Sequence, residues 1–262
     1  TMQLQKLFFR SSSGVVVALF CRCGALASTP DAFAAACARR NFSAVVPSFP
    51  TTQGRFVVRD MSQGLPPKRR RGCALWLALF PNTAVPRCTK YDVGKFAERR
   101  FNVYTSSHYQ NTSTSIGGFG GVRDVHVGLD LGAPVGTPVH VPFDGFLYGF
   151  GYNADHGDYG HVLVTQHRFE PENLTFWILY GHLSASSVAF KARRDELRAG
   201  AHIASIGGRS ENGGWPPHLH LQISLVEPTH PHDMPGVVSL HDRAAALRTY
   251  PDPRLLLSQF LY

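Results

Sequence analysis

Three groups of histidine and aspartate in the second half of the chain have residue types suited to holding a metal ion and moving protons. The first contains His126 and Asp130, the second contains His182, and the third is the pair His218 and His220. A catalytic zinc site uses three protein ligands drawn from His, Asp and Glu and keeps one position open. It also uses uncoordinated groups nearby for proton transfer and oxyanion stabilisation. Each group alone is compatible with a structural role, but together they favour a metal site.

The sequence does not support other common hydrolytic sites. The helical zinc motif H-E-x-x-H is absent, and so is the serine motif G-x-S-x-G. All 5 cysteines precede position 89, outside the histidine-rich part, so that part holds no cysteine nucleophile. An odd cysteine count also argues against a disulfide framework.

Apolar and polar residues alternate along positions 218–223, where His218 and His220 stand. This period of two predicts a β-strand. Residues two apart on a strand point to the same face, roughly 6.6 Å apart along the chain. We therefore expect both imidazoles to project from the face opposite Leu219 and Leu221.

The elements expected to position these groups are short strands separated by turn signals. From about residue 101, Gly, His and alternating apolar residues are frequent, and long helical periodicity is absent. This texture predicts an all-β fold with an antiparallel sheet core. Short helices are expected at 188–198 and within 242–260. The expected strands are 122–127, 138–143, 145–152, 160–167, 174–181, 201–206 and 218–224.

Positive charge is concentrated in the N-terminal part of the chain. Residues 1–100 contain 16 Lys and Arg against 4 Asp and Glu, whereas residues 101–262 contain 10 against 14. The overall charge of +8 therefore does not describe the histidine-rich part. No nucleic-acid partner is expected for that part.

Composition divides the chain into three segments. Residues 1–72 are interpreted as a basic extension and linker that is a targeting segment or disordered, and residues 73–111 as a lead-in. Residues 112–262 are expected to form the β-core domain with a C-terminal extension. The basic, proline-containing run at 66–71 is interpreted as a solvated linker, with binding to a polyanion or membrane surface as the alternative.

The first 60 residues are rich in Arg and Ser and contain two acidic residues, Asp31 and Asp60. This composition is typical of a mitochondrial transit peptide, and it favours a mitochondrial location over a secreted or cytoplasmic one. Two other interpretations stay open: a secretory signal cleaved after Ala27, and natural translation from Met61. No apolar run here is long enough to span a bilayer.

The order of short motifs resembles the lysostaphin-type (LytM-like) zinc metallopeptidases, whose β-sheet core is called the duplicated hybrid motif. The resemblance covers roughly residues 112–226 and includes the approach to the His-x-His strand at 200–207. The motifs that carry it are His126-x-x-x-Asp130, Gly136-Thr137-Pro138-Val139, Asp144-Gly145, Tyr180-Gly181-His182-Leu183 and Pro217-His218-Leu219-His220.

The resemblance implies a metalloendopeptidase that holds one zinc ion per chain and hydrolyses a peptide substrate, in peptidoglycan-like or Gly-rich peptides. His126, Asp130 and His220 resemble the family's zinc ligands, and His182 and His218 resemble its two uncoordinated catalytic histidines. The alternative is a non-catalytic, zinc-containing binding or regulatory module on the same fold.

Two segments depart from the family pattern. Residues 209–216 replace a shorter turn before the His-x-His strand, and the hairpin at 151–160 is longer and more acidic. Both are expected to line a substrate groove, where Tyr180, Asn212 and Trp215 are candidate substrate contacts. Positions 211–220 and 251–255 are similar to a subgroup fused to kinase-like and class III aminotransferase domains.

Overall fold

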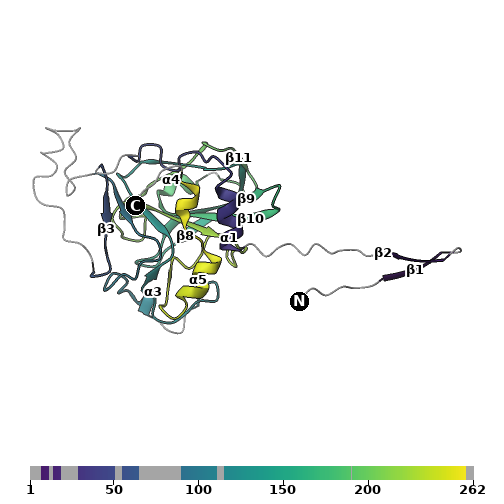
Figure 1. Ribbon diagram of the computed structural model, residues 1–262. Helices are drawn as coiled ribbons and strands as arrows, with labels where there is room; N and C mark the ends of the chain where they lie inside the picture. Colours follow the sequence, from purple (N-terminus) through teal and green to yellow (C-terminus); the bar gives the residue numbers. More distant parts are fainter. Residues whose placement is uncertain are drawn as a thin grey trace, which may run out of the picture.

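A computed structural model of the chain describes residues 7–11, 14–18, 29–50, 55–64, 90–110, 115–189 and 191–257. Strands dominate these residues, and the helices are short (Figure 1). The strands are β1 (Leu7–Ser11), β2 (Gly14–Ala18), β3 (Val57–Arg59), β4 (Asp92–Gly94), β5 (Val125–His126), β6 (Leu129–Gly132), β7 (Pro138–His140), β8 (Gly145–Asn153), β9 (Gly160–Phe169), β10 (Leu174–Leu183), β11 (Glu196–Leu197), β12 (His202–Ser205), β13 (His218–Ser224) and β14 (Val237–Val238). The helices are α1 (Pro30–Cys37), α3 (Ser107–Gln110), α4 (Ala185–Val188), α5 (Arg243–Thr249) and the 3-10 helix η1 (Pro253–Leu256).

The central element is an 8-stranded sheet in the order β11-β8-β9-β10-β13-β6-β4-β3. Neighbouring strands are antiparallel, apart from the parallel pair of β3 with β4 at one edge. Three two-stranded pairs, β1-β2, β12-β7 and β14-β5, are the other sheets of the described residues. The predicted all-β, antiparallel fold is confirmed.

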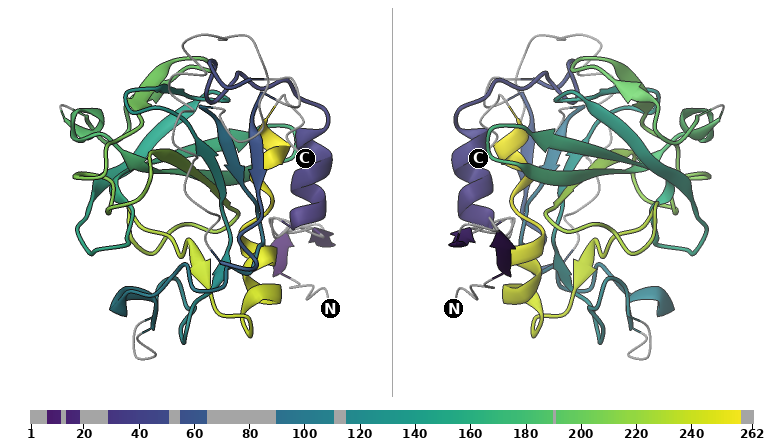
Figure 2. Two further views of the ribbon diagram at one scale, coloured as in Figure 1. Left: turned by 90° about the vertical axis from the view of Figure 1, so that its left-hand side faces the viewer. Right: turned by 90° about the vertical axis from the view of Figure 1, so that its right-hand side faces the viewer.

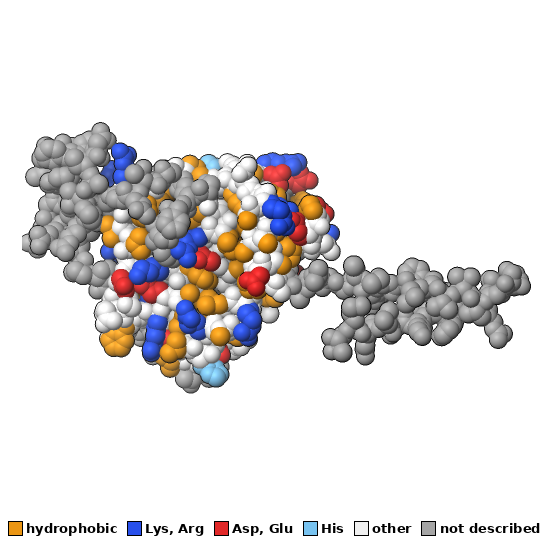
Figure 3. Space-filling view, in the orientation of Figure 1, with side chains coloured by type: hydrophobic (Ala, Val, Ile, Leu, Met, Phe, Trp, Pro, Cys, Tyr) orange, Lys and Arg blue, Asp and Glu red, His pale blue; other side chains and the backbone are white. Residues whose placement is uncertain are grey.

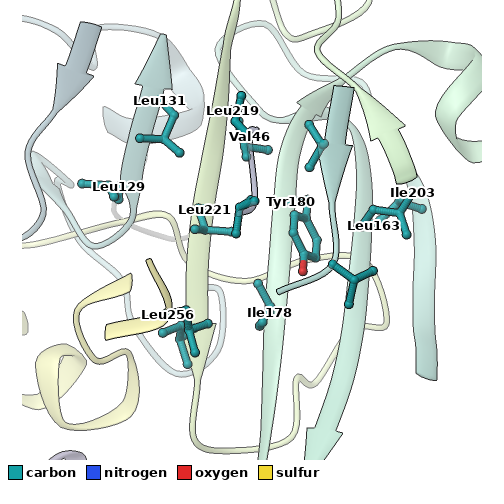
Figure 4. Close-up of a cluster of buried hydrophobic side chains, with 14 of the residues drawn as sticks. Val46, Leu129, Leu131, Leu163, Ile178, Tyr180, Ile203, Leu219, Leu221 and Leu256 are labelled. Atoms are coloured by element: carbon teal, nitrogen blue, oxygen red, sulfur yellow. The ribbon is translucent and has the colours of Figure 1, made fainter. Parts of the chain in front are cut away.

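The His-x-His strand β13 lies inside the sheet, between β10 and β6. Leu219 and Leu221 are fully buried and pack with Leu129 and Leu131 of β6, as Figure 4 shows. Because side chains alternate along a strand, the histidines of β13 face the other side of the sheet. The hydrophobic core therefore fixes which face of β13 carries the imidazoles.

The strand predicted at 122–127 is shorter in the structure, where β5 covers Val125–His126 and a separate strand, β6, follows at Leu129–Gly132. The two strands pair with different partners. Gly128 stands at the division, where an added Cβ would lie 2.2 Å from the His220 ring. Glycine therefore allows the backbone to approach that ring closely. β6 was not among the strands expected from the sequence.

The helix predicted at 188–198 is wrong. The helix α4 ends at Val188, and the chain then follows the edge of β8. Arg194 N donates to Leu147 O at 2.7 Å, and Leu147 N donates to Asp195 O at 2.9 Å. Most side chains from 191 to 200 are exposed, so a helix there would bury no apolar face.

The second expected helical region, 242–260, contains a real but shorter helix. α5 ends at Thr249, and prolines follow at 251 and 253. Proline lacks the N–H that an α-helix needs and clashes with the preceding turn. The chain continues as η1, and residues 258–260 lie outside the described part.

Part of the segment interpreted as an extension contributes to the core. In α1, Phe33 is fully buried, with ring centroids 5.8 Å from Phe169 and 5.0 Å from Phe176. Thr29 caps the helix by accepting from Ala32 N at 3.2 Å. Figure 2 shows α1 standing beside the sheet. The boundary expected at residue 72 is therefore corrected, because α1 and the strand β3 belong to the folded unit.

The expected linker at 66–71 and most of the expected targeting segment lie outside the described residues. Among the helices that the structure describes, none combines the length and apolar character needed to cross a bilayer. On the face drawn in Figure 3, basic and acidic side chains are interspersed and do not form one basic patch.

We expect Phe33→Ala to lower the free energy of unfolding by about 3–5 kcal/mol, because it leaves a cavity between two aromatic rings. Urea unfolding measures this change. The exposed Phe101, whose surface is 58% accessible, provides a control, and Phe101→Ala should change stability by less than about 0.5 kcal/mol. Equal effects of the two substitutions would show that α1 does not contribute to the core.

The buried His167 should make the fold acid-sensitive. Burial lowers the pKa of His167 from 6.5 to about 4. Between these values the unfolded chain binds the proton more readily, so stability is lost as the pH falls from 6.5 towards 4. We expect His167→Gln to remove roughly 2–3 kcal/mol from the difference between the unfolding free energies at pH 7 and pH 4.5.

The measurement uses metal-free protein, so that loss of a metal does not add to the pH effect. The exposed His241 serves as the control, and His241→Gln should leave the native pH dependence unchanged. A His167→Gln protein with the native pH dependence would contradict the prediction.

Candidate active site

Three donor atoms converge on one face of the sheet. His126 Nε2 lies 3.0 Å from His220 Nδ1 and 3.1 Å from Asp130 Oδ1, and His220 Nδ1 lies 3.2 Å from the same Oδ1. Ligands at the usual zinc bond lengths around a tetrahedron stand roughly 3.3–3.5 Å apart. The spacing and the His-Asp-His donor set therefore fit a zinc ion.

Strand pairing brings these residues together. In the register of β13 with β6, His220 stands opposite Asp130. His126 comes from β5, one residue before the bend at Val127 and Gly128. His126 N donates to Glu98 O at 2.9 Å, which fixes the backbone at that point. Each candidate ligand is thus placed by backbone hydrogen bonds and not by a flexible loop.

The second ring nitrogen of each candidate ligand is also held. His126 Nδ1 lies 3.1 Å from Lys95 O, and His220 Nε2 lies 3.0 Å from Gln222 Oε1. Metal-binding histidines commonly donate their other N–H to such oxygens, which fixes the tautomer and the ring orientation. The nitrogens that face each other are therefore the ones left free to bind a metal.

The electrostatics favour the ligating protonation states. Burial alone would raise the pKa of Asp130, but His126, Arg100 and His218 hold it well below its usual range. Burial, together with the nearby Arg100 cation, lowers the pKa of His126 to about 4. At neutral pH the site therefore presents an ionised carboxylate and a neutral imidazole, which are the forms that bind a metal.

His182 and His218 lie beside the three donors, with ring centroids 4.2 Å apart. His182 Nδ1 lies 2.9 Å from Asn212 O, and His218 Nδ1 lies 2.6 Å from Pro216 O. A carbonyl oxygen only accepts, so each Nδ1 carries the proton and each Nε2 keeps its lone pair. His218 Nε2 is 3.7 Å from Asp130 Oδ1, which places it next to the donor cluster.

Both of these histidines are neutral near pH 7. Burial lowers the pKa of each, and for His182 the neighbouring His218 and His220 lower it further. His182 also has a positive φ of 63°, a conformation uncommon for residues other than glycine. The structure thus brings all five predicted metal and catalytic residues together, and their individual roles stay predictions.

The three candidate substrate contacts have different surroundings. Trp215 lines a cavity of about 880 Å³ that also contains the five clustered residues. Tyr180 instead points into the hydrophobic core, as Figure 4 shows, and it is fully buried. Asn212 is also fully buried, and its side chain bonds to backbone atoms of Gly207, Gly214 and Trp215. Of the three, only Trp215 is positioned to contact a substrate.

The structure adds Tyr159 to the site, a residue the sequence analysis did not select. Its hydroxyl lies 3.5 Å from His220 Nε2, 3.3 Å from Gln222 Oε1 and 3.1 Å from Met234 O. An added Cβ at Gly181 would lie 2.7 Å from the Tyr159 ring. The glycine in the Tyr-Gly-His motif is the one sequence signal that reflects this packing.

Comparison with known proteins indicates the class of enzyme to which this site is similar. Residues 124–231 match Peptidase family M23. The match contains all five clustered residues and none of β3 or β4. Combined with the donor set of His126, Asp130 and His220, it supports a hydrolase of the zinc metalloprotease class.

Among curated proteins, 101 residues are 33% identical to the "DD-carboxypeptidase/endopeptidase Mpg" of Neisseria meningitidis serogroup B and to its namesake in Neisseria gonorrhoeae. These alignments cover 38% of this chain and 20% of each relative. The chain therefore spans about a fifth of the length of these relatives.

Two solved structures are also similar to the chain. A zinc-containing peptidase from Vibrio cholerae is 25% identical over 43% of this chain and 31% of that chain, with a TM-score of 0.31. The catalytic domain of the prophage-encoded M23 protein EnpA from Enterococcus faecalis, a point mutant, is 22% identical. That alignment covers 44% of this chain and 76% of that domain, with a TM-score of 0.33.

We expect His220→Ala to reduce zinc affinity at least about 100-fold, because it removes one of three ligands. Competition with a chromophoric chelator measures the affinity. His202→Ala, which changes an exposed histidine on β12, should leave affinity within about twofold of the native value. Native zinc affinity in His220→Ala would exclude this residue as a ligand.

Proposed function

We propose that the chain is a zinc-dependent metalloendopeptidase. The observation that carries this proposal is the pairing of a three-donor cluster with two neutral histidines whose Nε2 atoms are free. A zincin-type glutamate base is not needed in such an arrangement, because two imidazoles stand within reach of the donors. The M23 match over residues 124–231 supports peptide-bond hydrolysis as the chemistry.

His126 Nε2, Asp130 Oδ1 and His220 Nδ1 would hold one zinc ion per chain. Zinc in such a site polarises a substrate carbonyl and lowers the pKa of water. His182 and His218 would accept and return protons at Nε2, since their Nδ1 atoms are bonded to backbone carbonyls. A neutral imidazole can act as a base at pH 7, and its protonated form can then donate to the leaving amine.

The proposed substrate is a peptide bound along the cavity beside Trp215. The relatives named DD-carboxypeptidase/endopeptidase support peptides containing D-amino acids, of the peptidoglycan-like kind, and Gly-rich peptides are a further candidate. The long loop before β13 forms part of the wall, so it would contribute to the choice of peptide. The narrower similarity to the kinase and aminotransferase fusion subgroup, and the mitochondrial location, remain predictions.

Removing either free imidazole tests the proposed chemistry. We expect His182→Ala and His218→Ala each to lower kcat for peptide cleavage about 10²–10⁴-fold, the usual contribution of a general acid or base. Zinc content, measured by metal analysis, should stay near one ion per chain. His241→Ala provides an exposed control with unchanged kcat.

The assay uses the full chain and a library containing Gly-rich, D-amino-acid and ordinary L-peptides. If both variants cleave at the native rate with zinc retained, the proposed roles of the two histidines are wrong. If the native chain binds zinc tightly but cleaves nothing in the library, a non-catalytic binding module is the better description.

A further inference from the structure

A buried arginine lies directly behind the candidate metal ligands. Arg100 is 4% exposed, and its Nη1 lies 2.8 Å from Asp130 Oδ2. Nη1 also donates to the Tyr104 hydroxyl at 2.8 Å, and Nε donates to Glu98 Oε2 at 3.2 Å. The guanidinium is therefore fixed on several sides while it holds one oxygen of the carboxylate.

The two oxygens of Asp130 have separate partners. Oδ2 is bonded to Arg100, whereas Oδ1 faces His126 Nε2 and His220 Nδ1. A free carboxylate could rotate about its terminal torsion, which is broad for aspartate. The arginine contact selects the orientation in which Oδ1 points at the imidazoles.

The backbone leaves space for this contact at Gly94. Gly94 pairs with Asp130 across β4 and β6. An added Cβ would lie 2.7 Å from Arg100 Nη2 and 2.9 Å from Asp130 Oδ2. A side chain at this position would therefore displace the arginine, the carboxylate or both.

The same segment also supports His126. Lys95 O, next to Gly94, lies 3.1 Å from His126 Nδ1. Positions 94, 95 and 100 precede the M23 match, which begins at residue 124. A stretch outside the matched region thus contacts two of the three candidate ligands.

We propose that Arg100 is a positioning residue of the metal site, holding Asp130 in its ligand orientation from a segment outside the M23 region. This proposal rests on the proposed function in one respect: it requires that His126, Asp130 and His220 bind zinc. Arg100 also lines the cavity, but the role proposed for it is exerted through Asp130. Partners of this kind usually contribute 10–100-fold to metal affinity.

Charge repulsion between Arg100 and a bound cation would act in the opposite direction. The buried Glu98, 3.2 Å from Arg100 Nε, largely compensates the arginine charge as seen from the metal site. A compensated pair exerts a weak net field, whereas the hydrogen bond to Oδ2 acts at contact distance. Orientation is therefore expected to outweigh repulsion.

The experiment measures zinc affinity of the full chain by chelator competition, without any peptide. Arg100→Met removes the contact, and Arg100→Lys keeps the charge but loses the planar fork. Gly94→Ala keeps Arg100 but crowds both Arg100 and Asp130. The matched control is Arg99→Met, which changes the residue next to Arg100. It breaks an exposed ion pair between Arg99 and Asp124.

We expect zinc affinity to fall 10–100-fold in Arg100→Met and Gly94→Ala, to fall by a smaller factor in Arg100→Lys, and to stay within about twofold in Arg99→Met. Circular dichroism verifies folding. If Arg100→Met does not fold, Arg100→Lys decides, because it keeps the buried charge and leaves the surroundings of Asp130 otherwise unchanged. Native or tighter zinc binding in the folded variants would overturn the proposal, since repulsion would then dominate.

This outcome is independent of peptide cleavage. A native chain that cleaves no peptide but loses zinc affinity on Arg100→Met would refute the proposed enzyme and keep the positioning role. If the native chain cleaves peptide but zinc affinity is unchanged in Arg100→Met and Gly94→Ala, the proposed enzyme stands and the positioning role is refuted.

Discussion

The pairing of β13 with β6 is the constraint on which the candidate site depends. This register places His220 opposite Asp130, and a slip of β13 by one residue would turn His220 towards the hydrophobic core. Leu219 and Leu221 resist that slip, because their burial requires the opposite face. The apolar packing on one face of the sheet therefore determines the geometry of the polar site on the other face.

The buried charges of the site need partners, and the surrounding segments supply them. A buried carboxylate such as Asp130 is costly unless it is paired and hydrogen-bonded. Arg100 supplies the pairing, and Glu98 then compensates the arginine. Glu98 itself accepts from Met61 N at 3.0 Å, which ties the network to the chain beyond β3. The segments around β3 and β4 thus supply the partners of the buried Asp130.

The sequence predicted those features whose signals are local. Alternation along 218–223 identified β13 and its polar face, because a period of two survives whatever the strand pairs with. The helix expected at 188–198 failed because the competing partner, the edge of β8, is remote in sequence. Arg100 had no signature at all, since a buried arginine and an exposed one look alike until the chain folds. Tyr180 looked functional because it stands two residues before His182, where regular alternation would place both side chains on one face. The strand register shifts between Tyr180 and Leu183, and His182 has a positive φ of 63°, so Tyr180 stays in the core.

The loop before β13 holds both candidate catalytic histidines and lines the cavity. Its carbonyls at Asn212 and Pro216 fix the tautomers of His182 and His218, and Trp215 between them lines the cavity. The Asn212 side chain donates to Trp215 O at 3.1 Å, so the carbonyls and the cavity wall form one hydrogen-bonded unit. A change in this loop that suits a new peptide must therefore preserve two carbonyl positions. This requirement explains why a fully buried asparagine, which contacts no substrate, belongs to the site as much as the residues that line it.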